Sequence, residues 1–260
     1  MSKSKRQNEE PERKTFHYVD RTVDEPFMIP DSYSQIDPAQ MQELQMPEGS
    51  LGYTIATGNA TGIVVCFEVP PETAMPFDNP EDLVHYLHET MNENQGIIEV
   101  RNGKCKNGGR YVYYIMKYSY GEDDIPSRVC GYQLNFNFEI DDHVYFISGS
   151  FDEAGMTGQR DSIGLMLHAK SKEQAGQAAD LTDIMEHDWF CDPYDPDYTK
   201  GFLMNRSEVP ELDSMFPEHP LSVTRSLVSF VVLTKKTFYT ALVVYLKWFC
   251  KPLIPAISKI

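Results

Sequence analysis

Strict alternation of apolar and polar residues marks the segment YQLNFNFEI. Every second residue in it is apolar, namely Tyr132, Leu134, Phe136, Phe138 and Ile140. Side chains of a strand point alternately to its two faces, so this pattern predicts a β-strand with one buried face and one wet or polar face. HVYFISGSF follows after Asp141 and Asp142, and we expect the two segments to form an antiparallel hairpin.

Four more runs of β-branched and aromatic residues predict strands. LGYTIAT and TGIVVCFEV are separated by GNA, which is typical of a hairpin. GIIEVRNG leads through KCKNGG into RYVYYIMKYSY, with Asn107 and Gly108 as the turn signal. Six strands are therefore expected, mostly antiparallel.

Helical periodicity appears between and after these strands. A helix is expected from Pro80, capped by Asn79 or Asp78, with an apolar face of Leu83, Val84, Leu87 and Met91. A second is expected in AGMTGQRDSIGLMLHAK, capped by Thr157, with the apolar residues Ile163, Leu165, Met166 and Leu167. Residues 173–188 predict a short acidic helix with its inward positions at Ala178, Leu181 and Met185.

The fold class predicted is α+β, a mostly antiparallel six-stranded sheet with flanking helices, plus a C-terminal amphipathic helix. Four segments follow from the pattern. They are a mobile polar arm (1–24), an α+β sandwich domain (25–170), an acidic helix with a proline-rich wrapping segment (171–220), and a basic amphipathic helix with a tail (221–260).

The order strand, strand, helix, four strands, helix resembles the PsbP-like superfamily, which includes the yeast Ran-release factor. The resemblance covers roughly residues 45–170. ISGSFDEAGMTGQRDS, a strand that runs into a helix, is the stretch that carries it. Members of this superfamily are α/β/α sandwiches that mostly bind or assemble with other proteins. The resemblance therefore implies a non-catalytic role and a protein partner, and it transfers no site residues.

Charge divides the chain unevenly. The 260 residues carry a net charge of −16, which disfavours a nucleic acid partner. Residues 221–260 hold six basic and no acidic side chains, so residues 1–220 hold 17 basic and 39 acidic ones, a net charge of −22. This charge asymmetry is the strongest compositional signal in the sequence, and it sets the C-terminal segment apart from the rest of the chain.

The periodicity of the C-terminal segment predicts a helix with a narrow basic stripe and a wide apolar face. Its predicted contact residues for an anionic membrane surface or a partner protein are Arg225, Lys236, Lys247, Lys251, Trp248 and Phe249. Two alternatives explain the same pattern. The helix packs on its own acidic domain, or it forms a homo-oligomer through the apolar face.

Candidate chemistry is sparse. WFCDPYDPDY lacks the glycine and glutamate of a calcium loop, and its Asp and Pro residues favour a structural turn. The alternative is a metal-dependent hydrolase with a site at His187, Cys191 and Asp192. In HYLHE, His85, His88 and Glu89 are expected to be solvated helix residues.

Nucleotide-binding glycine motifs are missing, so no cofactor is expected. The five cysteines are odd in number and widely spaced, which favours reduced thiols. The first residues lack a secretory pattern, so the expected compartment is the cytoplasm, with peripheral membrane attachment through the C-terminal helix. The sequence predicts a non-enzymatic cytoplasmic interaction module.

Overall fold

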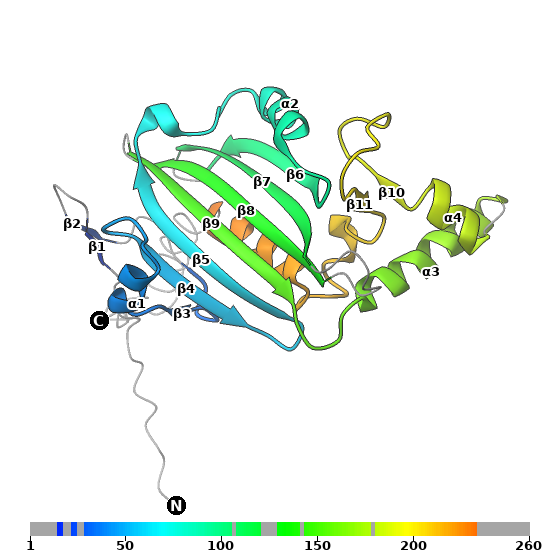
Figure 1. The fold of residues 1–260 in the computed structure, drawn as a ribbon, viewed down its shortest axis with the longest axis horizontal. Coiled ribbons are helices and arrows are strands. Elements are labelled where there is room, and N and C mark those ends of the chain that lie inside the picture. Colours follow the sequence, from blue (N-terminus) through cyan, green and yellow to red (C-terminus); the bar gives the residue numbers. More distant parts are fainter. Residues whose placement is uncertain are drawn as a thin grey trace, which may run out of the picture.

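A computed structural model of the chain describes residues 15–17, 22–24, 29–105, 108–120, 129–140, 143–177 and 180–232. Its centre is an antiparallel sheet of seven strands in the order β3-β4-β5-β9-β8-β7-β6 (Figure 1). The strands are β3 (Ser34–Gln35), β4 (Leu51–Ala56), β5 (Ala60–Val69), β6 (Gln95–Lys104), β7 (Arg110–Tyr120), β8 (Val129–Ile140) and β9 (His143–Glu153). The α+β prediction is confirmed, with β3 added to the six expected strands.

Local turns account for most of the strand order. The hairpins β4-β5, β6-β7 and β8-β9 all form as the sequence predicts. Strand β5 pairs with β9 rather than with β6, its successor in the chain. The chain therefore crosses from the middle of the sheet to its far edge, and the connection carries the helix α2 (Pro80–Thr90).

Helices cover the two faces of the sheet unequally. On one face, Leu83 and Leu87 of α2 pack over apolar residues of β6 and β7. On the other face lies a C-terminal helix, residues 220–232, seen in orange behind the sheet in Figure 1. Its buried residues join the main core cluster and are Leu221, Val223, Leu227, Val228 and Val231.

The predicted alternation in β8 places its apolar residues as expected. All five apolar side chains are buried, and Phe136 stacks on Phe138 with ring centroids 5.3 Å apart. The opposite side of the strand is less exposed to solvent than predicted, since Asn135 and Asn137 are also buried.

Helices α3 (Gln159–Gln174) and α4 (Leu181–His187) extend away from the sheet as an arm (Figure 1). Ala169, Ile184 and Trp189 form a small core of their own there. The predicted boundary at residue 170 is wrong, because α3 runs through it without a break.

The buried residues of α3 are not the apolar residues named for this helix from the sequence. Met166 and Leu167 are exposed, whereas Arg160, Gly164 and Ala169 are the buried residues of the helix. A Cβ on Gly164 would lie 2.5 Å from the Cβ of Ser207, so only glycine permits this approach. Close backbone packing and a buried guanidinium, rather than an apolar stripe, set the orientation.

Two further predictions about the arm are corrected. Gly158 precedes α3 in a left-handed conformation, with φ at 70°, and Thr157 does not cap it. In α4 the inward residue is Ile184, while Leu181 and Met185 are 50% and 40% exposed. Ala178 lies outside the described residues.

Short elements complete the chain. Strands β1 (Thr15–His17) and β2 (Thr22–Asp24) pair with each other within the segment predicted to be a polar arm. Helix α1 (Pro38–Glu43) precedes β4, and its N-cap Asp37 accepts a hydrogen bond from the Ala39 amide. The remaining elements are β10 (Phe190–Cys191), β11 (Met204–Asn205) and two 3-10 turns, η1 (Pro71–Thr73) and η2 (Pro210–Leu212).

Candidate functional site

The sheet presents an open face, which we define as the side chains of β5, β8 and β9 that point to the same side as α2. Strand register aligns Ile63, Ser150 and Gln133 in one row across this face. The next two rows are Val65, Ser148 and Asn135, and then Phe67, Phe146 and Asn137. These rows mix large apolar side chains with uncharged polar ones.

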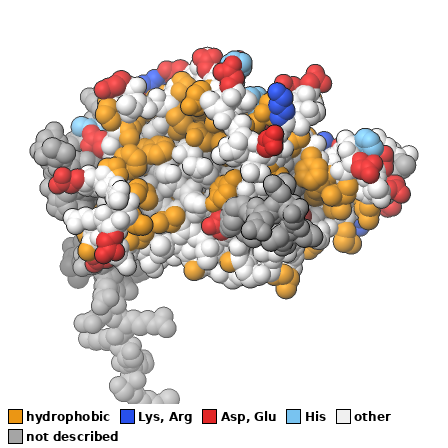
Figure 2. Space-filling view, viewed as in Figure 1, with side chains coloured by type: hydrophobic (Ala, Val, Ile, Leu, Met, Phe, Trp, Pro, Cys, Tyr) orange, Lys and Arg blue, Asp and Glu red, His pale blue; other side chains and the backbone are white. Residues whose placement is uncertain are grey.

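Exposure across the open face is uneven. Ile63 is 36% exposed, and Phe67, Phe146 and Ser148 are partly exposed. The rings of Phe67 and Phe146 meet edge to face at 5.4 Å, so they form one apolar ridge. In Figure 2, which views the molecule as in Figure 1, charged side chains lie mainly toward the rim.

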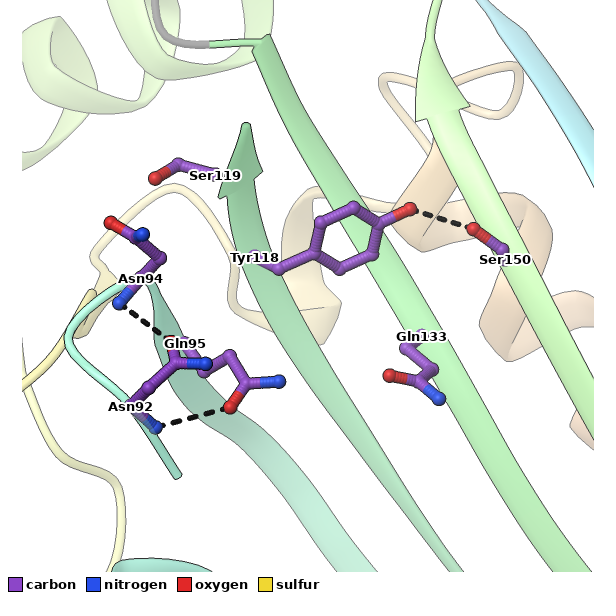
Figure 3. A pocket seen from close by; sticks show the side chains of 7 residues that line it. All are labelled: Asn92, Asn94, Gln95, Tyr118, Ser119, Gln133 and Ser150. Carbon is purple, nitrogen blue, oxygen red and sulfur yellow. Dashed lines mark hydrogen bonds between the residues drawn. The ribbon is translucent and has the colours of Figure 1, made fainter. Parts of the chain in front are cut away.

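A polar hollow of about 470 Å³ lies at one end of this face, where β6, β7, β8 and β9 meet the loop after α2 (Figure 3). Its volume is within the range typical of small-molecule sites. The lining side chains are all uncharged and are Asn92, Asn94, Gln95, Tyr118, Ser119, Gln133 and Ser150.

Tyr118 forms a fixed wall of the hollow. Its hydroxyl donates to Asp152 Oδ1 at 2.7 Å and lies 2.6 Å from Ser150 Oγ. The ring reaches across β8 directly over Gly131, where an added Cβ would lie 2.4 Å from Tyr118 Cζ. Glycine at this position is therefore what lets the tyrosine lie flat against the strand.

Carboxamides form the opposite wall. Asn92 Oδ1 accepts from the Asn94 amide at 2.9 Å, and Gln95 Oε1 accepts from the Asn92 amide at 3.1 Å. Each of these two side chains thus keeps its NH₂ group for another partner. Within the described part of the chain, the carboxamides of Asn94 and Gln133 make no hydrogen bond.

Beneath the other face of the sheet, charged side chains are buried in pairs. Lys117 Nζ lies 3.1 Å from Glu208 Oε2, and each side chain is only 1% exposed. Tyr132 donates to Glu208 at 2.8 Å and the Asn205 amide donates to it at 2.6 Å. The Lys117 ammonium also lies 4.0 Å from the centre of the Phe202 ring. The carboxylate has its hydrogen-bonding capacity filled by protein groups.

A second buried network joins the arm, the C-terminal helix and β6. Arg160 binds Asp213 at 2.8 Å and donates to the carbonyls of Ser207 and Val209. Arg225 binds Asp213 at 3.1 Å and Glu99 at 2.9 Å. These contacts tie the described part of the C-terminal helix to the domain.

Thiol groups in the described ranges are poorly placed for nucleophilic chemistry. Burial raises the pKa of Cys105 to about 11. Burial also raises the pKa of Cys130 and of Cys191. At neutral pH these three thiols stay protonated, and the thiolate is the reactive form.

The segment WFCDPYDPDY forms the predicted corner. Asp192 Oδ1 accepts from the backbone amides of Tyr194 and Asp195, both at 2.9 Å. Tyr194 then reaches edge strand β6, where its hydroxyl contacts the Val100 amide at 2.5 Å and the Val100 carbonyl at 3.1 Å. The corner therefore covers the edge of the sheet.

The structure does not assemble the alternative metal site. His187 is exposed and lies near Asp183 within its own helix, while Asp192 pairs with His88 at 3.0 Å. Across the described ranges, no three His, Cys, Asp or Glu side chains form a group that could hold a metal ion. The prediction that His88 is solvated is wrong, because it is 14% exposed and stacks on Tyr198.

Of the residues predicted for membrane or partner contact, Arg225 alone is described. Its side chain is 11% exposed and engaged with Glu99 and Asp213, so its prediction as a surface contact is wrong. The others lie outside the described residues and are Lys236, Lys247, Lys251, Trp248 and Phe249. In the portion of the chain that is described, no helix combines the length and apolar character needed to cross a membrane.

Sequence reasoning did not find the hollow or the buried pairs. One signal was present for Lys117, which lies in phase with Tyr113 and Ile115 on the inward side of β7. A lysine at such a position predicts a buried charge that needs a carboxylate partner. Asn92, Tyr118 and Gln133 carry no comparable signal, because only the strand register brings them together.

Comparison with known proteins places the chain in no established family. No family model matches its sequence, and no curated protein matches it significantly.

Proposed function

We propose that this chain is a non-enzymatic interaction module that binds a protein partner on the open face of its sheet. The observation that carries the proposal is the partial exposure of three large apolar side chains, Ile63, Phe67 and Phe146, in rows of this face whose other partly exposed side chains are polar and uncharged. Partly exposed apolar surface with a polar surround is typical of protein interfaces. The PsbP-like element order, with its implied α/β/α sandwich, agrees with a binding role.

Charge favours a protein with a basic contact rim over a lipid surface for this face. Residues 1–220 carry a net charge of −22, which repels an anionic bilayer and attracts basic side chains. The central rows contain no charged residue, so the partner should contact them with uncharged groups. Its basic residues should meet the rim of the face.

The state of the titratable groups also supports binding rather than catalysis. Lys117 and Glu208 neutralise each other inside the domain, and Arg225 is held by two carboxylates. A catalytic acid or base needs a proton path to a substrate, and these groups are enclosed by protein contacts.

Affinity capture with the purified full-length chain tests the proposal. A protein retained by the native chain should be lost with Ile63→Glu, because a carboxylate at this exposed apolar position of the open face disrupts an apolar contact with the partner. Met215→Glu is the matched control, since Met215 is also exposed, at 53%, and lies outside the open face. Binding must be reproduced with the purified partner and weaken in high salt. Equal binding by the native and Ile63→Glu chains would refute the proposal.

Attachment to an anionic membrane through residues 233–260 stays a second proposal. These residues hold five lysines and no acidic side chain, which is the charge pattern of a segment that binds anionic lipid. Cytoplasmic localisation with peripheral membrane attachment belongs to this proposal.

A further inference from the structure

We infer that the polar hollow is a binding site for an uncharged saccharide of one or two sugar units. The inference rests on the lining of the hollow and is independent of the protein partner proposed above.

The lining excludes most other ligand classes. Among the described residues, an anion would meet no cationic side chain in the hollow, and it would lie near Asp152 in a chain of net charge −16. A cation would find no carboxylate among the described lining side chains, and the Asp152 carboxylate already accepts from the Tyr118 hydroxyl. An apolar ligand would bury carboxamides without hydrogen-bond partners. An uncharged polar ligand remains.

The unpaired carboxamide groups of the hollow suit the adjacent hydroxyl groups of a sugar. A carboxamide presents a donor and an acceptor side by side, and a sugar hydroxyl both donates and accepts. Gln133 offers both halves of its amide, and Asn92 and Gln95 offer their NH₂ groups. These groups come from two sides of the hollow, residues 92–95 at the start of β6 and strand β8, so they can hold a ring between them (Figure 3).

Tyr118 supplies the apolar contact that a sugar ring requires. Its hydroxyl is held by Ser150 and Asp152, and its ring is supported by the backbone at Gly131. The ring is therefore fixed before a ligand arrives, which lowers the entropic cost of binding. The C–H groups of a pyranose can pack against such a surface while its hydroxyls reach the carboxamides.

Isothermal titration of the full-length protein tests this inference. The probes are maltose, cellobiose, lactose and N,N′-diacetylchitobiose, each up to 20 mM. At least one should bind with a millimolar or tighter Kd, and Gln133→Ala and Asn94→Ala should each weaken that binding at least tenfold. Gln42→Ala removes an exposed carboxamide on α1 and should leave the Kd unchanged.

Two results would overturn the inference. One is the absence of heat of binding for all four disaccharides with the native protein. The other is binding that survives both Gln133→Ala and Asn94→Ala unchanged. Unaltered thermal midpoints of both variants would show that lost binding reflects the hollow rather than unfolding. Either failure leaves the protein-binding proposal intact, because that proposal is tested by Ile63→Glu.

Discussion

Arg225 of the C-terminal helix and Glu99 of edge strand β6 form an ion pair of 2.9 Å, although they lie 126 residues apart in the chain. Both side chains are largely buried, at 11% and 9% exposure. Tyr113 also donates to Glu99, and Arg225 continues to Asp213. Arg225, which the sequence predicted to contact a membrane or a partner, thus links the C-terminal helix to the edge of the sheet through this ion pair.

Replacing Arg225 by leucine should destabilise the fold strongly. The change leaves Glu99 and Asp213 buried without their cation, and breaking a buried pair costs about 3–5 kcal/mol. The free energy of unfolding from urea denaturation measures this loss. Arg101→Leu is the control, because Arg101 is 61% exposed and lies 3.6 Å from Glu99, so it should cost under about 1 kcal/mol. Equal effects of the two changes would contradict the buried network.

Truncation should separate the two parts of the C-terminal segment. A chain that ends at Val232 keeps Leu227, Val228 and Val231 in the core and should unfold cooperatively. A chain that ends at Pro220 loses this apolar layer and should fail to fold, since each buried aliphatic side chain contributes about 1.5–3 kcal/mol. Circular dichroism with thermal melting distinguishes the outcomes. A stable fold ending at Pro220 would show that the helix is dispensable.

The chain that ends at Val232 also tests membrane attachment, because it keeps the folded domain and lacks residues 233–260. If residues 233–260 bind anionic lipid, the full-length protein should co-sediment with phosphatidylserine vesicles and the chain ending at Val232 should not. Binding should fall at high salt because it depends on lysines. Vesicles of phosphatidylcholine alone serve as the control. Equal sedimentation of the two chains would remove the membrane proposal.

Asp188 should make the stability of the arm depend on pH. The Lys172 ammonium, with smaller contributions from His168 and Arg206, holds the pKa of this carboxyl well below its usual range. Its contribution is therefore complete above the unfolded pKa of about 4 and is lost as pH falls through the lower folded value. Asp188→Asn should reduce the free energy of unfolding at pH 7 by about 1 kcal/mol, since solvent screens a carboxylate that is 30% exposed.

Urea denaturation between pH 7 and pH 2 measures the Asp188 effect. The difference between the native chain and Asp188→Asn should shrink below about pH 4. Asp183→Asn is the control, because Asp183 is 65% exposed beside His187 and should change stability little. A difference that stays constant down to pH 2 would contradict the low pKa.

Asn135 and Asn137 offer a matched pair on one side of β8. Both are buried, but the Asn135 Nδ2 has no hydrogen-bond partner among the described residues, while Asn137 accepts from the Met75 amide at 3.0 Å. Asn135→Val should raise the free energy of unfolding by about 1 kcal/mol, and Asn137→Val should lower it by about 1–3 kcal/mol. Thermal denaturation compares the stability of each variant with that of the native chain. Destabilisation by Asn135→Val would show that the Asn135 amide has a structural partner.

Local sequence determined the strands, their hairpins and the inward residues of β8 and α2. Alternation in β8 and the helical spacing of Leu83 and Leu87 follow from backbone geometry alone, so a short window of sequence contains them. The corner at Asp192 is likewise local, because its side chain binds amides two and three residues on.

Tertiary structure decided the rest. The orientation of α3 depends on how closely Gly164 approaches Ser207, and the burial of Lys117 depends on Glu208, which lies 91 residues away. The candidate site has the same origin, since Asn92, Tyr118 and Gln133 meet only when β6, β7 and β8 pair in register. Such contacts depend on long-range strand pairing and close packing, which periodicity within a single segment does not encode.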